Sequence, residues 1–159
     1  MPYSVSYDLI KFISFQGIHI IMKIHCLLPE SMSIISGAAC GAWWAGHVNR
    51  CGAPNGYLVV TVKGDDVKWR YKATGRPADY QFRVYKLGEF ETQKQYVVAN
   101  IWDWDIAYTV NWYEDGVLKG AMQQFDDEDQ DYLTMKKGKR TGYHTRHLFR
   151  ACPSKQAKK

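Results

Sequence analysis

The sequence predicts a mainly β protein: an antiparallel, β-sandwich-like domain with a Gly-rich, Trp-containing loop and little helix. Aromatic residues make up 14% of the chain, with six Trp and eleven Tyr, and aromatic side chains favour strands. Short segments that alternate between polar and apolar residues are separated by turn residues, as in antiparallel sheets. No long segment has the periodicity of an amphipathic helix. The length of 159 residues fits one domain.

Residues 1–35 form an atypical N-terminal segment. Residues 10–28 are rather apolar, but the charged and polar side chains of Lys11, His19 and Lys23 make a membrane-spanning helix costly. The first residues lack a positive region and a clear cleavage site, so no signal peptide is predicted and the localisation stays unassigned. The alternating stretch near the end of the segment is also compatible with a buried strand.

Residues 36–57 contain five Gly and one Pro, which predicts an irregular, turn-rich loop. Trp43 and Trp44 lie inside it, where they would anchor the loop against a core or a neighbouring domain. Cys40 and Cys51 flank part of the loop and could form a disulfide in an exported protein. Two partly buried thiols are an equally good interpretation. None of the four cysteines forms a Cys-x-x-Cys pair, so a zinc ribbon is not supported.

A β-hairpin is predicted directly after this loop. Residues 57–62 read as a mostly buried strand, residues 63–66 as a turn, and residues 68–72 as a half-buried strand that alternates strictly. Residues 79–85 repeat the alternation. We expect Tyr80, Phe82 and Val84 to point inward there, and Gln81, Arg83 and Tyr85 to point outward.

Further short strands are predicted over residues 96–102, 108–113 and 117–122, and a closing strand over residues 144–150. Asp115 and Gly116 supply a two-residue turn, since Gly accepts a positive φ. The only helix expected is a short one, either within residues 126–135 or near the N-terminus. Five or more short strands joined by turns favour an antiparallel sandwich.

Two clusters of potential metal ligands are interpreted as structural. His144 and His147 would share a face on a helix, but on the predicted strand they point to opposite faces. Residues 126–131 (DDEDQD) begin like a calcium-binding loop, but Tyr132 and Gly138 stand where Gly and Glu are required. We expect an acidic surface turn that pairs loosely with the basic residues 136–140.

Aromatic side chains give the best candidate for ligand binding. Trp102 and Trp104 flank Asp103 and share a strand phase, so one face of this pair could be open, with Tyr108, Trp112 and Tyr113 nearby. Flat aromatic faces stack on sugar rings and on cations. The alternative is that these aromatics form core, as alternating aromatics in strands usually do. The net charge of +5 comes without a nucleic-acid recognition motif, which argues against nucleic acid as a partner.

Four ordered blocks carry a family resemblance: residues 37–46 (GAACGAWWAG), 51–75 (CGAPNGYLVVTVKGDDVKWRYKATG), 79–85 (DYQFRVY) and 97–116 (VVANIWDWDIAYTVNWYEDG). Together they resemble the C-terminal domain of calcineurin-like metallophosphoesterases of Bacteroides-type bacteria. The resemblance covers residues 36–152, which we take as one β domain, and leaves residues 153–159 as a basic tail. His147-Leu148-Phe149 and Pro153 fit the closing segment of the family.

The resemblance implies a non-catalytic accessory domain that packs on or orients a metal-dependent catalytic domain. Phosphoesterase chemistry in this family belongs to that separate domain, which holds two divalent metal ions and would be joined in cis or encoded by an adjacent gene. We therefore expect no cofactor and no catalytic residue in this chain, and no enzymatic activity of the chain alone. His47 lies in a Gly-His-x-His-like position, but Asn49 replaces the second His.

Family members are typically exported, which would suit a Cys40–Cys51 bridge. The chain would then be a truncated product, a product of a mis-assigned start, or a detached domain. The leading hypothesis is that Trp43 and Trp44 dock on the catalytic domain. The alternative function is a carbohydrate-binding β-sandwich module, and a self-sufficient hydrolase is a third. Six residues are the candidate interdomain or ligand contacts: Trp43, Trp44, His47, Trp102, Trp104 and Tyr108.

Overall fold

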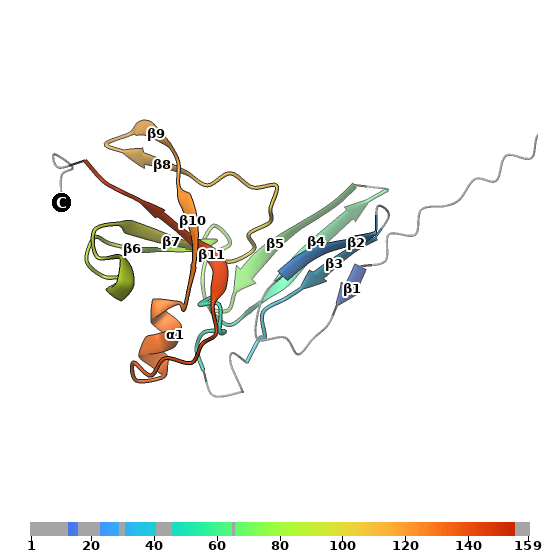
Figure 1. Cartoon of the computed structure of the whole chain (residues 1–159). Coiled ribbons are helices and arrows are strands. Elements are labelled where there is room, and N and C mark those ends of the chain that lie inside the picture. Colours follow the sequence, from blue (N-terminus) through green and yellow to red (C-terminus); the bar gives the residue numbers. More distant parts are fainter. Residues whose placement is uncertain (1–12, 16–22, 29–30, 41–45, 65, 155–159) are drawn as a thin grey trace, which may run out of the picture.

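A computed structural model describes residues 13–15, 23–28, 31–40, 46–64 and 66–154, and side chains from Ile34 onward (Figure 1). The described part is mainly β, its strand pairs are antiparallel with one exception, and it holds one short α-helix. The mainly β class with little helix is therefore confirmed. None of the helices in the described part is long and apolar enough to cross a membrane.

The first sheet has three strands in the order β1–β3–β2. These are β1 (Ile13–Phe15), β2 (Lys23–Leu28) and β3 (Ser31–Ile35). β2 and β3 are antiparallel, whereas β1 runs parallel to β3. Part of the segment that we set apart as atypical thus forms a sheet.

The predicted hairpin is confirmed as β4 (Gly56–Lys63) and β5 (Asp66–Ala73), which pair over their whole length. Tyr71 is buried and Trp69 is half-buried, as the alternation predicts. The prediction that β4 is mostly buried was wrong, because Tyr57 and Val62 are 51% and 61% exposed. The reason is that β4 and β5 form a sheet of only two strands, so much of the ribbon faces water.

The second large sheet has four antiparallel strands in the order β10–β11–β7–β6. They are β6 (Phe82–Tyr85), β7 (Val97–Ile101), β10 (Gln123–Asp127) and β11 (Thr145–Ala151). A separate hairpin, β8 (Asn111–Glu114) and β9 (Val117–Ala121), turns at Asp115 and Gly116, as predicted. Gly116 has the expected positive φ, and Asp115 has a positive φ as well. In Figure 1 this hairpin lies above the sheet and helix α1 (Gln130–Met135) lies below it.

The strand registers divide this sheet into two faces. Tyr85 pairs with Val98, and Asn100 pairs with both Arg83 and Leu148; these residues form what we call the inner face, which α1 covers. Its core joins Tyr85, Val98 and Leu148 to Phe90, which precedes a short 3-10 helix (Glu91–Gln93). The outer face is apolar over β6, β7 and the end of β11, where it carries Phe82, Val84, Val97, Ala99, Ile101, Phe149 and Ala151. On β10, Gln124 pairs with Phe149 and adds a polar side chain to this face.

The expected orientation of β6 was wrong. Tyr85 is 1% exposed, whereas Phe82 and Val84 are 49% and 42% exposed. Both alternating sets contain apolar or aromatic side chains, so a period of two cannot tell which set a distant helix will cover. Arg83 donates a hydrogen bond to Asp131 in α1, and the Tyr85 hydroxyl donates one to Asp129 at the start of α1. These two polar side chains therefore lie on the face that α1 covers.

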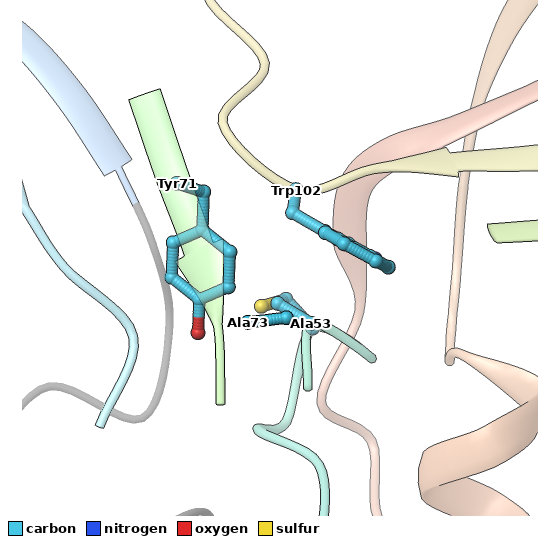
Figure 2. Close-up of a cluster of buried hydrophobic side chains, with 5 residues drawn as sticks. Ala53, Tyr71, Ala73 and Trp102 are labelled. Atoms are coloured by element: carbon cyan, nitrogen blue, oxygen red, sulfur yellow. The ribbon is translucent and has the colours of Figure 1, made fainter. Parts of the chain in front are cut away.

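A second core joins the loop before β4 to β5 and to the end of β7. It contains Cys51, Ala53, Tyr71, Ala73 and Trp102. Figure 2 shows the rings of Tyr71 and Trp102 flanking Ala53 and Ala73. The Trp102 ring meets the rings of Tyr80 and Tyr71 edge to face, at centroid distances of 4.5 and 6.1 Å. Such pairs add to the free energy gained from burial alone.

Candidate functional site

Asp129 is the centre of a buried polar network where α1 meets the inner face. It is the N-cap of α1, and its Oδ1 accepts a hydrogen bond from the backbone N–H of Tyr132 at 3.0 Å. Its Oδ2 accepts from the Tyr85 hydroxyl at 2.7 Å and from Asn100 Nδ2 at 2.8 Å. The residue is fully buried. One carboxylate therefore fixes the start of the helix to two strands.

The same network holds the loop before β4. Asn100 Nδ2 also donates to the backbone carbonyl of Cys51 at 2.6 Å. Gly52, next in the chain, has φ +81° and lies so close to Asp129 that an added Cβ would stand 2.0 Å from its Cγ. Asn49 is itself buried and bonds to the carbonyls of Ala53 and Pro54. The Gly-rich loop is thus shaped by contacts with residues far along the chain.

Glu128 is a second buried carboxylate, 2% exposed. Its Oε1 accepts hydrogen bonds from the backbone N–H groups of Thr141 and Gly142 and from the Thr141 hydroxyl. Arg140 forms ion pairs with Glu128 and Asp127. The predicted pairing of the acidic run with the basic run is confirmed at Arg140. The prediction of a surface turn was wrong, because Glu128 and Asp129 are both buried, each with its own set of hydrogen-bond donors.

The pKa values of the two buried acidic residues, Asp129 and Glu128, are shifted in opposite directions. Burial raises the pKa of Asp129 to about 6, against the opposing effect of its hydrogen bonds from Tyr85, Tyr132 and Asn100. Burial also raises the pKa of Tyr85, to which the negative charge of Asp129 adds. Glu128 is desolvated too, but the hydrogen bonds from Thr141, Gly142 and Arg140 outweigh this and hold its pKa below the usual range.

The pKa of Asp129 predicts a pH dependence of stability. A pKa raised from 3.8 to about 6 means that the folded state holds the proton more tightly than the unfolded state. The stabilisation is therefore complete below about pH 4 and is lost as pH rises through about 6. Glu128 acts in the opposite sense, so the contribution of Asp129 has to be isolated with a variant.

We expect the free energy of unfolding of the wild type to fall by about 1–3 kcal/mol more than that of Asp129→Asn between pH 4 and pH 7. Urea denaturation followed by circular dichroism at several pH values measures this difference. If the free energies of unfolding of the wild type and of Asp129→Asn changed equally between pH 4 and pH 7, Asp129 would have an ordinary pKa.

A polar pocket of about 560 Å³ opens next to the network. Side chains from five segments line it, among them His47, Asn55, Arg76, Arg83 and Asp131. Arg83 donates to Asp131, with Nε and Oδ2 2.7 Å apart. The guanidinium of Arg76 lies 5.3 Å from the centre of the Tyr80 ring. No pattern in the sequence groups these residues.

An apolar groove of about 440 Å³ lies on the other side of the sheet. Its floor is the outer face, and the β8–β9 hairpin and the residues around it form its wall, including Val110, Trp112, Tyr113 and Met122. Tyr113 is 64% exposed. The groove and its rim therefore leave a row of large apolar side chains in contact with water.

The structure separates the predicted contact residues. Trp102 is 1% exposed, so the expectation of an open face on this ring was wrong; edge contacts with Tyr71 and Tyr80 cover it. Trp104 is half-buried, and the centre of its ring lies 5.9 Å from the centre of the Phe149 ring. Tyr108 is 44% exposed. His47 is exposed at the polar pocket. Trp43 and Trp44 lie outside the described residues.

The cysteine and histidine predictions have different outcomes. Cys40 is exposed and Cys51 is buried, and the Cys40–Cys51 bridge stays a prediction. His144 is exposed just before β11, whereas His147 is buried within it. Among the side chains that the structure describes, no three His, Cys, Asp or Glu residues come together as a possible metal site.

Sequence reasoning missed the role of Asp129, Asn100 and Gly52. One signal was available, since Asp before a short helical segment is a common N-cap and residues 126–135 were expected to contain a helix. The contact of Asn100 with Asp129 had no local signal, because the two residues lie on different elements.

Comparison with known proteins gives one match. A family model described as the C terminal of calcineurin-like phosphoesterase matches residues 34–159, which is most of the chain and includes the loop, both cores, the polar pocket and the apolar groove. No curated protein and no solved structure matches the chain.

Proposed function

Because the chain belongs to the family of C-terminal domains of calcineurin-like phosphoesterases, we propose that it is an accessory domain that packs against a phosphoesterase catalytic domain. In this proposal the catalytic domain supplies the hydrolytic chemistry and holds the two divalent metal ions. The accessory domain orients that partner or restricts access to it. The ordered sequence blocks, such as residues 97–116, support an origin among Bacteroides-type enzymes.

The observation that carries the proposal is the apolar groove on the outer face. The strand face that floors the groove is apolar over β6 and β7 and partly open to water, and such a surface marks a place that another element or protein covers. Phe82 and Val84 stand at the open side of the groove and are 49% and 42% exposed. The neighbouring hairpin adds Val117 and Leu118, which are 59% and 54% exposed.

Groove and hairpin together have the character of an interface core. Such cores are enriched in aromatic and other apolar side chains and depleted of charge. The groove offers Phe82, Trp112 and Tyr113 as aromatic anchors, and Glu114 and Asp115 at its edge as polar rim. The Trp43–Trp44 pair is an additional contact in this proposal, supported only by its apolar character and its place in the Gly-rich loop.

The test begins with the partner. The DNA on both sides of the gene would be read for Asp-x-His, Gly-Asp-x-x-Asp and Gly-Asn-His motifs, and the domain that carries them would be produced separately. We expect it to bind this chain, and we expect Phe82→Glu to weaken binding about tenfold or more, because a charge would be buried at the interface. Calorimetry or surface plasmon resonance measures the dissociation constant.

Val62→Glu is the matched control, since Val62 is 61% exposed on β4, away from the groove. It should leave the dissociation constant unchanged, and circular dichroism should show that both variants are folded. Equal binding of Phe82→Glu and the wild type would exclude the groove as the interface. Flanking DNA without a phosphoesterase domain would contradict the proposal as a whole.

A further inference from the structure

Strand β6 is an open edge of the four-stranded sheet, and it borders the apolar groove (Figure 1). One side of β6 pairs with β7, and among the strands that the structure describes none pairs with its other side. Phe82 and Val84 are 49% and 42% exposed, so water reaches this edge. An edge strand presents backbone N–H and C=O groups with which a further strand can pair.

The hydrogen bonds to β7 show which backbone groups of β6 point outward. The backbone N–H of Trp102 donates to the carbonyl of Gln81, which sets the phase of the ladder. In an antiparallel ladder, hydrogen-bonded pairs alternate with pairs whose backbone groups point away from each other. Counted from Gln81, Phe82 and Val84 occupy the alternate positions, so their N–H and C=O groups face away from β7. The Val84 carbonyl has one long contact, 3.4 Å from Nη1 of Arg83.

The opposite edge of the sheet, β10, is protected against such pairing. It has a bulge between Phe125 and Asp127, and it carries Asp126 and Asp127. Bulges and charged side chains on an edge strand hinder its pairing with another chain. By contrast, β6 has no bulge and no proline, and the charge of its basic residue, Arg83, is balanced by Asp131. This contrast singles out β6 as the edge that can accept a strand.

The surroundings of β6 define the side chains of the strand that would pair with it. On the outer face, this strand would lie beside Phe82 and Val84 and extend the apolar floor of the groove. On the inner face, it would meet the ion pair of Arg83 and Asp131. Successive side chains of a strand point to opposite faces, so the segment has to be apolar at every second position and polar in between.

The charge of the groove adds a second requirement. The residues that line it include Glu114 and Asp115 but no Lys or Arg. Glu114 is paired with Lys119, whereas Asp115 forms no ion pair with any residue in the described ranges. A basic residue at the end of the incoming segment would complement this negative charge.

From the open edge, the two faces and the acidic rim, we infer that the partner domain docks by adding an extended, amphipathic segment with a basic end to the sheet, as a fifth strand next to β6. The inference rests on the proposed function for the identity of the partner. Main-chain hydrogen bonds to Phe82 and Val84 supply affinity. The alternate apolar side chains, which enter the groove, and the basic end supply specificity.

The test uses a peptide in place of the partner domain, together with the whole chain labelled with ¹⁵N. The probe is acetyl-Lys-Val-Thr-Val-Thr-Val-Lys-amide, which has the required alternation and basic ends. A titration gives its dissociation constant, and amide hydrogen exchange is then measured at ten times that concentration. We expect the exchange of the Phe82 and Val84 amides to slow about tenfold, because both N–H groups become hydrogen-bonded to the peptide.

Two controls separate strand pairing from other modes of binding. The peptide acetyl-Lys-Val-Val-Thr-Thr-Val-Lys-amide has the same composition, but one Val moves to the polar side, so it should bind about tenfold more weakly. Val84→Pro removes one edge N–H and should weaken binding about tenfold relative to Val84→Ala, which keeps it. Edge strands tolerate proline, and circular dichroism checks that both variants are folded.

Three results would each overturn the inference: unchanged exchange of the Phe82 and Val84 amides, equal binding of the two peptides, or equal affinity in Val84→Pro and Val84→Ala. The catalytic domain takes no part in the peptide experiment, so these failures would leave the Phe82→Glu test of the docking proposal intact. Conversely, failure of the catalytic domain to bind would contradict the proposed function and would not alter the result with the peptide.

Discussion

Asp129→Ala is expected to lower the free energy of unfolding by about 3 kcal/mol or more. The substitution removes the acceptor for three hydrogen bonds, from Tyr85, Asn100 and the backbone of Tyr132. These donors would stay buried without a protein partner, and α1 would lose its N-cap. Urea denaturation followed by circular dichroism and by Trp fluorescence measures the change.

Asp126→Ala is the matched control in the same acidic run. The side chain of Asp126 is 58% exposed, and its Oδ1 lies 3.5 Å from Nδ1 of the exposed His144, a contact that is an ion pair only when the imidazole is protonated. Exposed pairs of this kind contribute little, so its removal should change stability by no more than about 0.5 kcal/mol. If the two alanine variants were equally stable, the network around Asp129 would have no special role in the fold.

Gly52→Ala is expected to be the most damaging single-methyl substitution in the described residues, costing about 3–5 kcal/mol or preventing folding. Gly52 has φ +81°, where residues with a Cβ are strained. The new Cβ would stand 2.0 Å from Cγ of Asp129, whose three hydrogen bonds keep it from moving aside. Thermal unfolding and urea denaturation would both report the loss.

The variant Gly64→Ala separates the backbone strain from the steric clash of the added Cβ. Gly64 in the β4–β5 turn also has positive φ, at +57°, but an added Cβ would meet nothing within 4 Å. It should therefore cost only the backbone strain, about 1–2 kcal/mol. The difference between the two variants measures the steric contribution at Asp129. Equal costs would mean that the loop can shift away from the helix.

The hairpins were predictable because their signals are local. Alternation at Trp69 and Tyr71 and the Asp115–Gly116 turn lie within a few residues of the structure that they specify. The face of β6 was not predictable in the same way. Whether Tyr85 or Val84 is buried depends on α1, which follows more than forty residues later in the sequence.

The candidate sites were the least predictable part of the molecule. The polar pocket draws His47, Arg76, Arg83 and Asp131 from four separate segments, and apart from the incomplete Gly-His-x-His pattern at His47 none of them stands in a recognisable motif. Aromatic content pointed correctly to a β fold, but it could not distinguish the buried ring of Trp102 from the exposed ring of Tyr113. Exposure is a property of packing between elements, which composition does not encode.

The two hydrogen bonds of Asn100 have a consequence for how the chain folds. This one amide joins the carbonyl of Cys51 to Asp129, so the Gly-rich loop can take its final shape only when β7 and the start of α1 are both in place. Ordering the loop thus requires closing a long stretch of chain, which slows folding in proteins with distant contacts. The early loop and the late helix therefore form a single cooperative unit, and their amide protons should exchange with solvent only when that whole unit opens.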